Sequence, residues 1–211
     1  MRRAISWVGL VFALIIPAAG LTRFLPAIPG IPHDLLREGY FWGLWLLIIA
    51  WVLLVERRPL ASIGIKRPTW RTLAYGALAV VAIVVAAALV LWALFSALHL
   101  KEFPDGQKEL YHLPFWLRFL LVTRAAVVEE TLFRGYGIER LQELTGSPWL
   151  AGIATYLIFV GAHLNGYGWL QLCGVGTSAA VMTLLYFWRR DLLSNMVAHW
   201  LIDALGLLLR G

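Results

Sequence analysis

This sequence has few charged residues. Charged residues make up 14% of its 211 residues, whereas ordinary soluble domains carry about 25%. Hydrophobic residues make up 61%, so the composition excludes an ordinary soluble domain and indicates an integral membrane protein. The single cysteine, Cys173, cannot form an internal disulfide and offers no thiolate metal site.

The net charge of +6 does not indicate a protein that binds nucleic acid. Lys and Arg lie mostly in short loops between apolar runs, where positive charge orients membrane spans. With the N-terminus in the cytoplasm, the inner segments contain Arg2, Arg3, Arg57, Arg58, Lys66, Arg67, Arg71, Arg134, Arg140, Arg189 and Arg190. The outer segments then contain Arg23, Arg37, Lys101, Lys108 and Arg210. The excess on the first side predicts a cytoplasmic N-terminus.

Long apolar runs dominate the chain. They cover residues 4–19, 40–55, 73–98, 113 onward, 149–164, 169–188 and 192–209, and with their flanks they approach the ~20 residues that a spanning helix needs. We predict an all-α, polytopic transmembrane helix bundle of about seven spans. The chain is expected to form one integral membrane domain, 1–211, with its motif-bearing core at about 113–210. The first run also has the pattern of a signal peptide, but with so many spans behind it we expect it to be retained.

Two adjacent carboxylates, Glu129 and Glu130, follow directly on one of these apolar runs. A charge at mid-bilayer depth costs roughly 3 kcal/mol, and such a residue is by default a functional site with a nearby partner. Glu130 and Arg134 are four residues apart and share a helix face, so they can pair. Glu129 points about 100° away. The spacing predicts one carboxylate with a fixed counter-ion and one that is free for chemistry.

The segment that follows this motif is polar. Residues 138–144, Ile-Glu-Arg-Leu-Gln-Glu-Leu, contain three charged side chains and a glutamine, which predicts the water-exposed end of the same helix or a short surface helix. Gly146 is typical of a helix stop, and Ser147-Pro148 is typical of the cap and first position of the next helix.

Two further polar patterns lie inside apolar runs. Phe159 and His163 are one helical turn apart, and Asn195, His199 and Asp203 recur every four residues along one face. Taken singly, each histidine is best explained as a packing residue bonded to a neighbouring carbonyl, and the asparagine as an interhelical hydrogen bond.

Considered together, the polar residues of the apolar segments indicate a functional site. Glu129, Glu130, His163, His199 and Asp203 lie on three apolar segments, and burying each of them unpaired would cost several kcal/mol. We therefore expect them to converge on one polar pocket. Carboxylates with imidazoles suit a hydrolase that activates water, and the same set suits a divalent metal.

In this order, the three motifs resemble those of the CPBP family, the CAAX-processing and bacteriocin-processing intramembrane proteases, also called the ABI family or type II CAAX prenyl endopeptidases. They are Glu129-Glu130-x-x-x-Arg134, Phe159-x-x-x-His163 and His199-x-x-x-Asp203. Residues 62–67, Ser-Ile-Gly-Ile-Lys-Arg, also look like a short signature of this family.

The resemblance implies an intramembrane glutamate-type endopeptidase that hydrolyses a peptide bond of a membrane-associated protein or peptide, with prenylated CAAX-type proteins among the candidate substrates. It implies the following roles: Glu129 and His163 activate water, His199 and Asp203 line the oxyanion side, and Glu130 and Arg134 hold the site together, with Phe159 and Asn195 in support.

One position departs from the eukaryotic CAAX endopeptidase, which has asparagine where this chain has Asp203. An ionised aspartate is a poor oxyanion donor, so Asp203 is protonated, or orients His199, or accompanies a metal. No His-Glu-x-x-His pattern is present, and we expect no required cofactor. If a divalent metal such as zinc binds, its ligands are expected to be Glu129, His163 and His199.

Other functions remain open at this stage. They are a metal-dependent version of the same protease, a non-catalytic bacteriocin-immunity or scaffold protein, and a small proton- or ion-coupled transporter. The expected partners are the lipid bilayer and a membrane-embedded or lipidated peptide or protein, with no nucleic acid. The resemblance also suggests the inner membrane of a prokaryotic cell.

Overall fold

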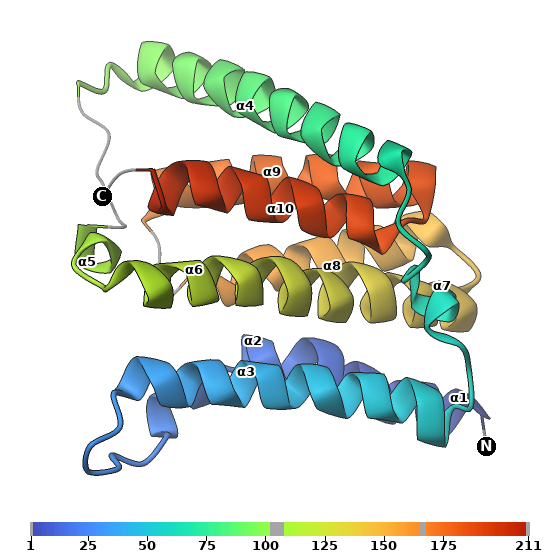
Figure 1. Cartoon of the computed structure of the whole chain (residues 1–211). Coiled ribbons are helices and arrows are strands. Elements are labelled where there is room, and N and C mark those ends of the chain that lie inside the picture. The colour runs from blue at the N-terminus through green and yellow to red at the C-terminus, as the bar shows by residue number, and fades with distance from the viewer. Residues whose placement is uncertain (1, 102–107, 165–167, 210–211) are drawn as a thin grey trace.

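The computed structural model describes residues 2–101, 108–164 and 168–209. Within these ranges the chain is built of helices and connectors and contains no strand. The helices run side by side in stacked tiers, with α4 (Trp70–Leu98) along one edge (Figure 1). The predicted all-α bundle is confirmed.

Seven helical rods account for the apolar runs. In chain order they are α1, η1 and α2 (Arg2–Leu10, Val11–Ile15, Ile16–Ala18); α3 and η3 (His33–Ala50, Trp51–Val55); α4; α6, η5 and α7 (Phe115–Arg124, Ala125–Ile138, Glu139–Thr145); α8 (Pro148–Ala162); α9 (Trp169–Arg189); and α10 (Leu192–Leu207). The short elements η2 (Leu21–Phe24), η4 (Leu60–Ile63) and α5 (Lys108–Tyr111) lie in the connectors.

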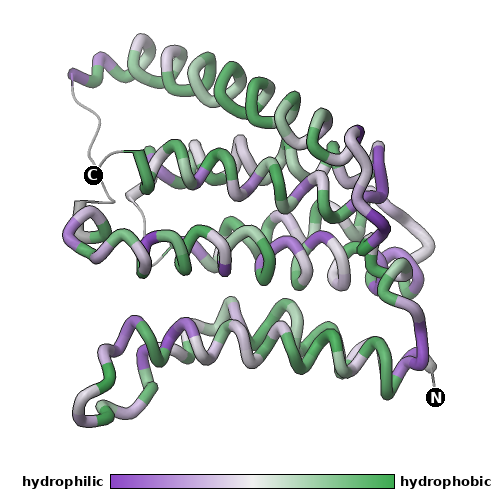
Figure 2. The backbone as a smooth tube through the Cα atoms, viewed as in Figure 1, coloured by the Kyte–Doolittle hydropathy of each residue, from purple (hydrophilic) through white to green (hydrophobic). Residues whose placement is uncertain are grey.

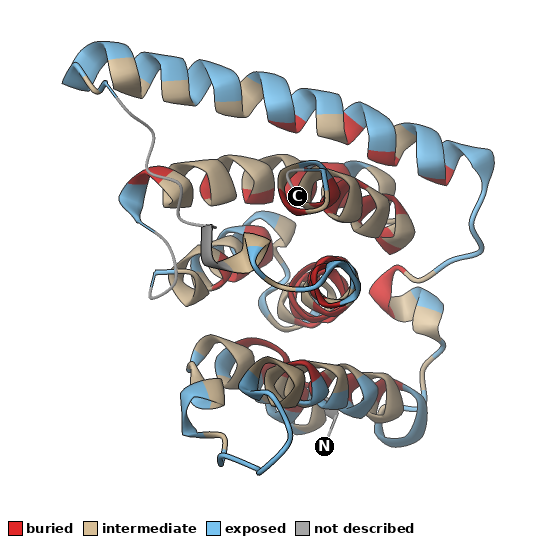
Figure 3. Cartoon of the chain, turned by 60° about the vertical axis from the view of Figure 1, so that its left-hand side comes forward, coloured by how far each residue is buried: buried red, intermediate tan, exposed pale blue. Residues whose placement is uncertain are grey.

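The centre of the bundle is η5, a π-helix that carries the glutamate motif. It packs against α10, α8, α3, η1 and η4, and nearly all of its side chains are buried. Figure 3 shows the contrast with α4, which is pale blue along most of its length, whereas buried residues gather in the middle tiers. The motif therefore lies on the most enclosed helix of the protein.

The outer surface is apolar, as expected of a protein whose solvent is lipid. Leu73, Leu89 and Trp92 on α4 are all more than half exposed, and the tube of Figure 2 is green along most of that helix. In the part of the chain that the structure describes, three helices are long and apolar enough to cross a membrane: His33–Val55, Trp70–Leu98 and Trp169–Arg189. Shorter apolar helices cover Arg3–Ala18, Pro148–Ala162 and Leu192–Leu207.

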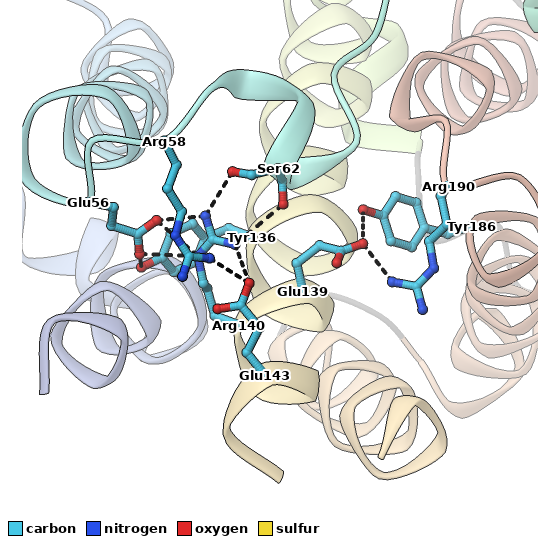
Figure 4. A network of polar contacts seen from close by, with 9 residues as sticks. All are labelled: Glu56, Arg58, Ser62, Tyr136, Glu139, Arg140, Glu143, Tyr186 and Arg190. Atoms are coloured by element: carbon cyan, nitrogen blue, oxygen red, sulfur yellow. Dashed lines mark hydrogen bonds and ion pairs between the residues drawn. The ribbon is translucent and has the colours of Figure 1, made fainter. Parts of the chain in front are cut away.

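A polar network closes one end of the bundle (Figure 4). Arg140 of α7 is fully buried. It donates to both carboxylate oxygens of Glu56, at 2.6 to 3.1 Å, and to the Ser62 hydroxyl at 3.0 Å. Tyr136 donates to Glu56 at 2.7 Å. The prediction that residues 138–144 form a water-exposed end was wrong for Arg140, because its charge neutralises the carboxylate of Glu56, whose side chain is 4% exposed.

Burial also corrects the charge count used for orientation. Arg134 and Arg140 were counted among the inner loop residues, but both are buried inside the bundle, at 1% and 0% exposure. The remaining inner residues still outnumber the outer ones. The orientation itself stays a prediction.

The connector after η3 is lodged between helices. Ile63 is completely buried, and the carbonyl of Gly64 accepts a hydrogen bond from the backbone N–H of Leu192 at 2.9 Å. The carbonyl of Ile63 lies so close to Gly135 that a Cβ there would be 2.8 Å from it. Residues 62–65 thus anchor the motif helix and α10 at the same end.

We predict that Gly135→Ala destabilises the protein. The added methyl would meet a backbone oxygen, which cannot rotate away as a side chain can, and overpacking of this kind typically costs about 1–3 kcal/mol. Gly43→Ala on α3 is the matched control, because a Cβ there meets nothing within 4 Å. Denaturant unfolding in mixed micelles measures both. Equal stability of the two variants would contradict the close approach.

The predicted helix boundary after α7 is confirmed. Gly146 ends that helix with a positive φ of 73°, the conformation that glycine adopts without strain. The Ser147 hydroxyl oxygen accepts a hydrogen bond from the backbone N–H of Leu150 at 3.2 Å, and Pro148 takes the first helical position.

Candidate active site

Glu130 is the most enclosed charge of the motif. Its side chain has no exposed surface, and Arg134 donates to its Oε1 at 3.0 Å. His199 Nδ1 lies 2.8 Å from the same oxygen, and Asn195 Nδ2 donates to Oε2 at 3.3 Å. A buried carboxylate is tolerated only with such partners. The predicted pairing of Glu130 with Arg134 is present.

Residues of α10 face this carboxylate along one side of the helix, as their four-residue spacing predicts. Asn195 also donates to the carbonyl of Met182 on α9 at 2.7 Å. His199 Nε2 lies 3.4 Å from Asp203 Oδ2. The His199 ring is therefore held between two carboxylates, and it can donate to both only when both ring nitrogens carry a hydrogen.

Glu129 lies outside this network and has its own counter-ion. Arg124 Nη1 donates to Glu129 Oε1 at 2.6 Å, and Arg124 Nε donates to Glu38 Oε1 of α3 at 3.3 Å. The prediction that Glu129 has no ionic partner was wrong. The reason is the π-helix, whose i→i+5 turn brings residues 124 and 129 to one face. Its side chain is nevertheless 17% exposed, in contrast to that of Glu130.

Phe159 links the second motif to the first. The Arg134 guanidinium lies 4.2 Å from the centroid of the Phe159 ring, and the His163 ring lies 4.6 Å from the same ring, centroid to centroid. His163 Nδ1 lies 2.7 Å from the Phe159 carbonyl oxygen. A carbonyl only accepts, so Nδ1 carries the hydrogen and the lone pair of the neutral ring is on Nε2.

The described side chains do not assemble a metal site. Across 2–101, 108–164 and 168–209, no three His, Cys, Asp or Glu residues are grouped so that they could hold a metal ion. The residues expected as ligands, Glu129, His163 and His199, thus do not form such a group.

Two residues of the site were missed in the sequence. Arg124 lies inside the apolar run that begins at residue 113, and a 3.6-residue period places it away from Glu129, so the sequence does not indicate that these two side chains pair. Glu38 precedes the apolar run 40–55 and looks like an ordinary charge at the end of a span. Its role is seen only in the structure, where its side chain is 3% exposed, and acids are almost never fully buried without a partner.

Comparison with known proteins adds the family. Comparisons with curated proteins and with solved structures give no significant match. Residues 111–205 match the family model described as type II CAAX prenyl endopeptidase Rce1-like. This range contains all three motifs, with Glu129, Glu130 and Arg134 of the first and the histidines of the second and third, His163 and His199. The segment 111–205 is therefore similar to the type II CAAX prenyl endopeptidases of the Rce1-like family, as the motifs indicated.

Proposed function

We propose that this protein is an intramembrane endopeptidase that hydrolyses a peptide bond in a membrane-embedded or lipidated substrate of the CAAX type. The observation that carries the proposal is the contrast between two neighbouring carboxylates. Glu130 is completely buried and bonded to three side chains, whereas Glu129 is partly exposed and held by one arginine. One acid serves the structure, and the other can reach water.

In the proposed reaction Glu129 and His163 activate the water. Glu129 takes a proton as the water oxygen attacks the scissile carbonyl carbon, and His163 shares that proton through Nε2. The proton then passes to the amide nitrogen as the C–N bond breaks. The products are a carboxylate and an amine, so that water is added across the bond.

His199 is proposed to stabilise the oxyanion. Glu130 fixes the ring from one side by accepting from Nδ1 at 2.8 Å, and Asn195 in turn donates to Glu130. Nε2 faces Asp203, whose side chain is 39% exposed. A substrate oxyanion can take the place of this long contact, and a donor so positioned typically contributes about 10²–10³-fold to kcat. Asp203 then orients the ring and does not itself donate.

We propose that the chain lies in the inner membrane of a prokaryotic cell with its N-terminus in the cytoplasm. The support is the excess of Lys and Arg on one side of the spans. Cysteine modification from either side of sealed vesicles, at a cysteine introduced near position 67, measures the orientation.

The test of the proposed function is cleavage of a farnesylated CAAX-type peptide and of its unprenylated counterpart by the purified protein in liposomes, with products identified by mass spectrometry. Cleavage at one defined bond supports the proposal. A folded protein that binds these peptides without cleaving them would favour the non-catalytic immunity or scaffold function instead.

Cleavage is predicted to continue after treatment with EDTA or 1,10-phenanthroline. The reason is that the described acids and histidines form no three-residue ligand group, so that water activation is assigned to side chains alone. The rate of peptide cleavage measures this, with and without added Zn²⁺. A loss that Zn²⁺ restores would instead support the metal-dependent protease.

A further inference from the structure

Arg124 is shared by two acids from different helices. Its side chain is 12% exposed, that of Glu38 is 3% exposed and that of Glu129 is 17% exposed. The guanidinium uses Nε for Glu38 and Nη1 for Glu129, and its carbon lies 4.8 Å from the centroid of the Phe41 ring. Three contacts from two helices thus hold the plane of this guanidinium.

The stability of the protein does not require a charge at Glu38, because an apolar side chain could fill the same position. It lies on α3, outside the segment that matches the family model. Its Oε2 is buried and has no hydrogen-bond partner among the described residues. Buried ion pairs are often no more stabilising than well-packed apolar residues, so a half-satisfied acid here reduces stability. Its value is expected to lie in what it does to Arg124.

Glu129 cannot hold its own position. It has one hydrogen bond from Arg124, at 2.6 Å, on a long side chain that would otherwise sample several rotamers. An arginine bound only to Glu129 would move with it. An arginine that is also bound to Glu38 and packed on Phe41 is fixed, and fixes Glu129 in turn.

We propose that Glu38 is a positioning residue for catalysis, acting through Arg124 to aim the carboxylate of Glu129. The proposal rests on the proposed function, in which Glu129 activates the water. The rate of an enzymatic reaction depends steeply on the position of the catalytic group. A mutation that lies away from the reacting atoms but displaces this group by 1 Å can reduce the rate roughly 100-fold. Glu38 touches Arg124 and does not need to touch the substrate.

The test compares Glu38→Leu with Glu38→Gln in the liposome cleavage assay. Glu38→Leu removes the anchor, and kcat is expected to fall roughly ten- to hundredfold, with KM unchanged because substrate binding is not affected. Glu38→Gln keeps an oxygen that accepts from Arg124 Nε and is expected to recover most of the lost kcat. The unfolding midpoint of Glu38→Leu should equal or exceed that of the unmodified protein.

Two controls establish the route through Arg124. In an Arg124→Met background, Glu38→Leu is expected to have no further effect on kcat, because the connecting residue is absent. Tyr40→Phe removes a hydrogen bond of the same helix, from the Tyr40 hydroxyl to the Ile16 carbonyl, without touching Arg124, and should retain the original kcat.

The outcomes separate this inference from the proposed function. If the unmodified protein cleaves no peptide, or Glu129→Gln cleaves normally, the proposed function fails and the role of Glu38 fails with it. If Glu129→Gln is inactive but Glu38→Leu retains full kcat, only the role of Glu38 is overturned. A loss of kcat that equals a loss of folded protein, or that persists in the Arg124→Met background, would also overturn it.

Discussion

Replacing Glu129 with glutamine is expected to reduce peptide cleavage strongly while the bundle remains folded. Glutamine has nearly the same shape and can still accept the hydrogen bond from Arg124, which Glu129 receives at 2.6 Å. It cannot take a proton from water. General-base catalysis contributes typically about 10²–10⁴-fold, so kcat should fall by that factor and KM should change little. Glu129→Ala should lose at least as much.

The measurement is the initial rate of product formation in liposomes, with unfolding recorded on the same preparations. Asp34→Asn is the matched control, since Asp34 is an acid on α3 with a side chain that is 37% exposed and paired with Arg37. It should keep the original rate. Normal cleavage by both Glu129 variants would remove the basis of the proposed mechanism.

Replacing Arg140 with methionine is expected to produce the largest loss of stability. The substitution leaves Glu56, whose side chain is 4% exposed, with a negative charge and only the Tyr136 hydroxyl as its partner in Figure 4. Removing one member of a buried ion pair typically costs about 3–5 kcal/mol, because the other charge is left uncompensated. Denaturant unfolding in mixed micelles measures the loss.

Arg58→Met is the matched control for this substitution. Arg58 pairs with Glu143 in the same network, but both side chains are about a third or more exposed, and exposed pairs contribute about 0–1 kcal/mol. The double variant Glu56→Gln with Arg140→Met should recover part of the loss, since no unpaired charge remains. If Arg140→Met is as stable as Arg58→Met, the buried pair does not stabilise this end of the bundle.

This end of the protein should be insensitive to pH in the neutral range. Burial acts to lower the pKa of Arg140, but its hydrogen bonds to Glu56 and the charge of Glu56 outweigh this, so its pKa lies above the ordinary value. A raised pKa of a cation contributes stability below that pKa and loses it only as pH rises through it. For an arginine this lies far above neutrality.

The order of helices and the three motifs could be predicted because each is written locally in the sequence. Apolar runs predict membrane-spanning helices. A polar residue at every fourth position, as at His199 and Asp203, predicts a polar face of a helix. The contact of Asp203 with His199 at 3.4 Å matches one of the roles left open for that aspartate.

What could not be predicted depends on pairing between distant segments. The hydropathy of residues 113–138 is compatible with an α-helix or a π-helix, yet only the π-helix brings Arg124 to Glu129. Glu38 contacts Arg124 across 86 positions of sequence, and no periodicity reports such a contact. The burial of Arg140 likewise depends on Glu56, which belongs to another rod.

A wide helix at the centre of a bundle needs room. Two positions of the π-helix η5, Gly135 and Gly137, have no space for a side chain. At Gly137 a Cβ would come within 2.9 Å of Leu14 and 3.0 Å of Thr155. The π-helix that places Arg124 beside Glu129 can thus pack closely against its neighbours only because these positions are glycine.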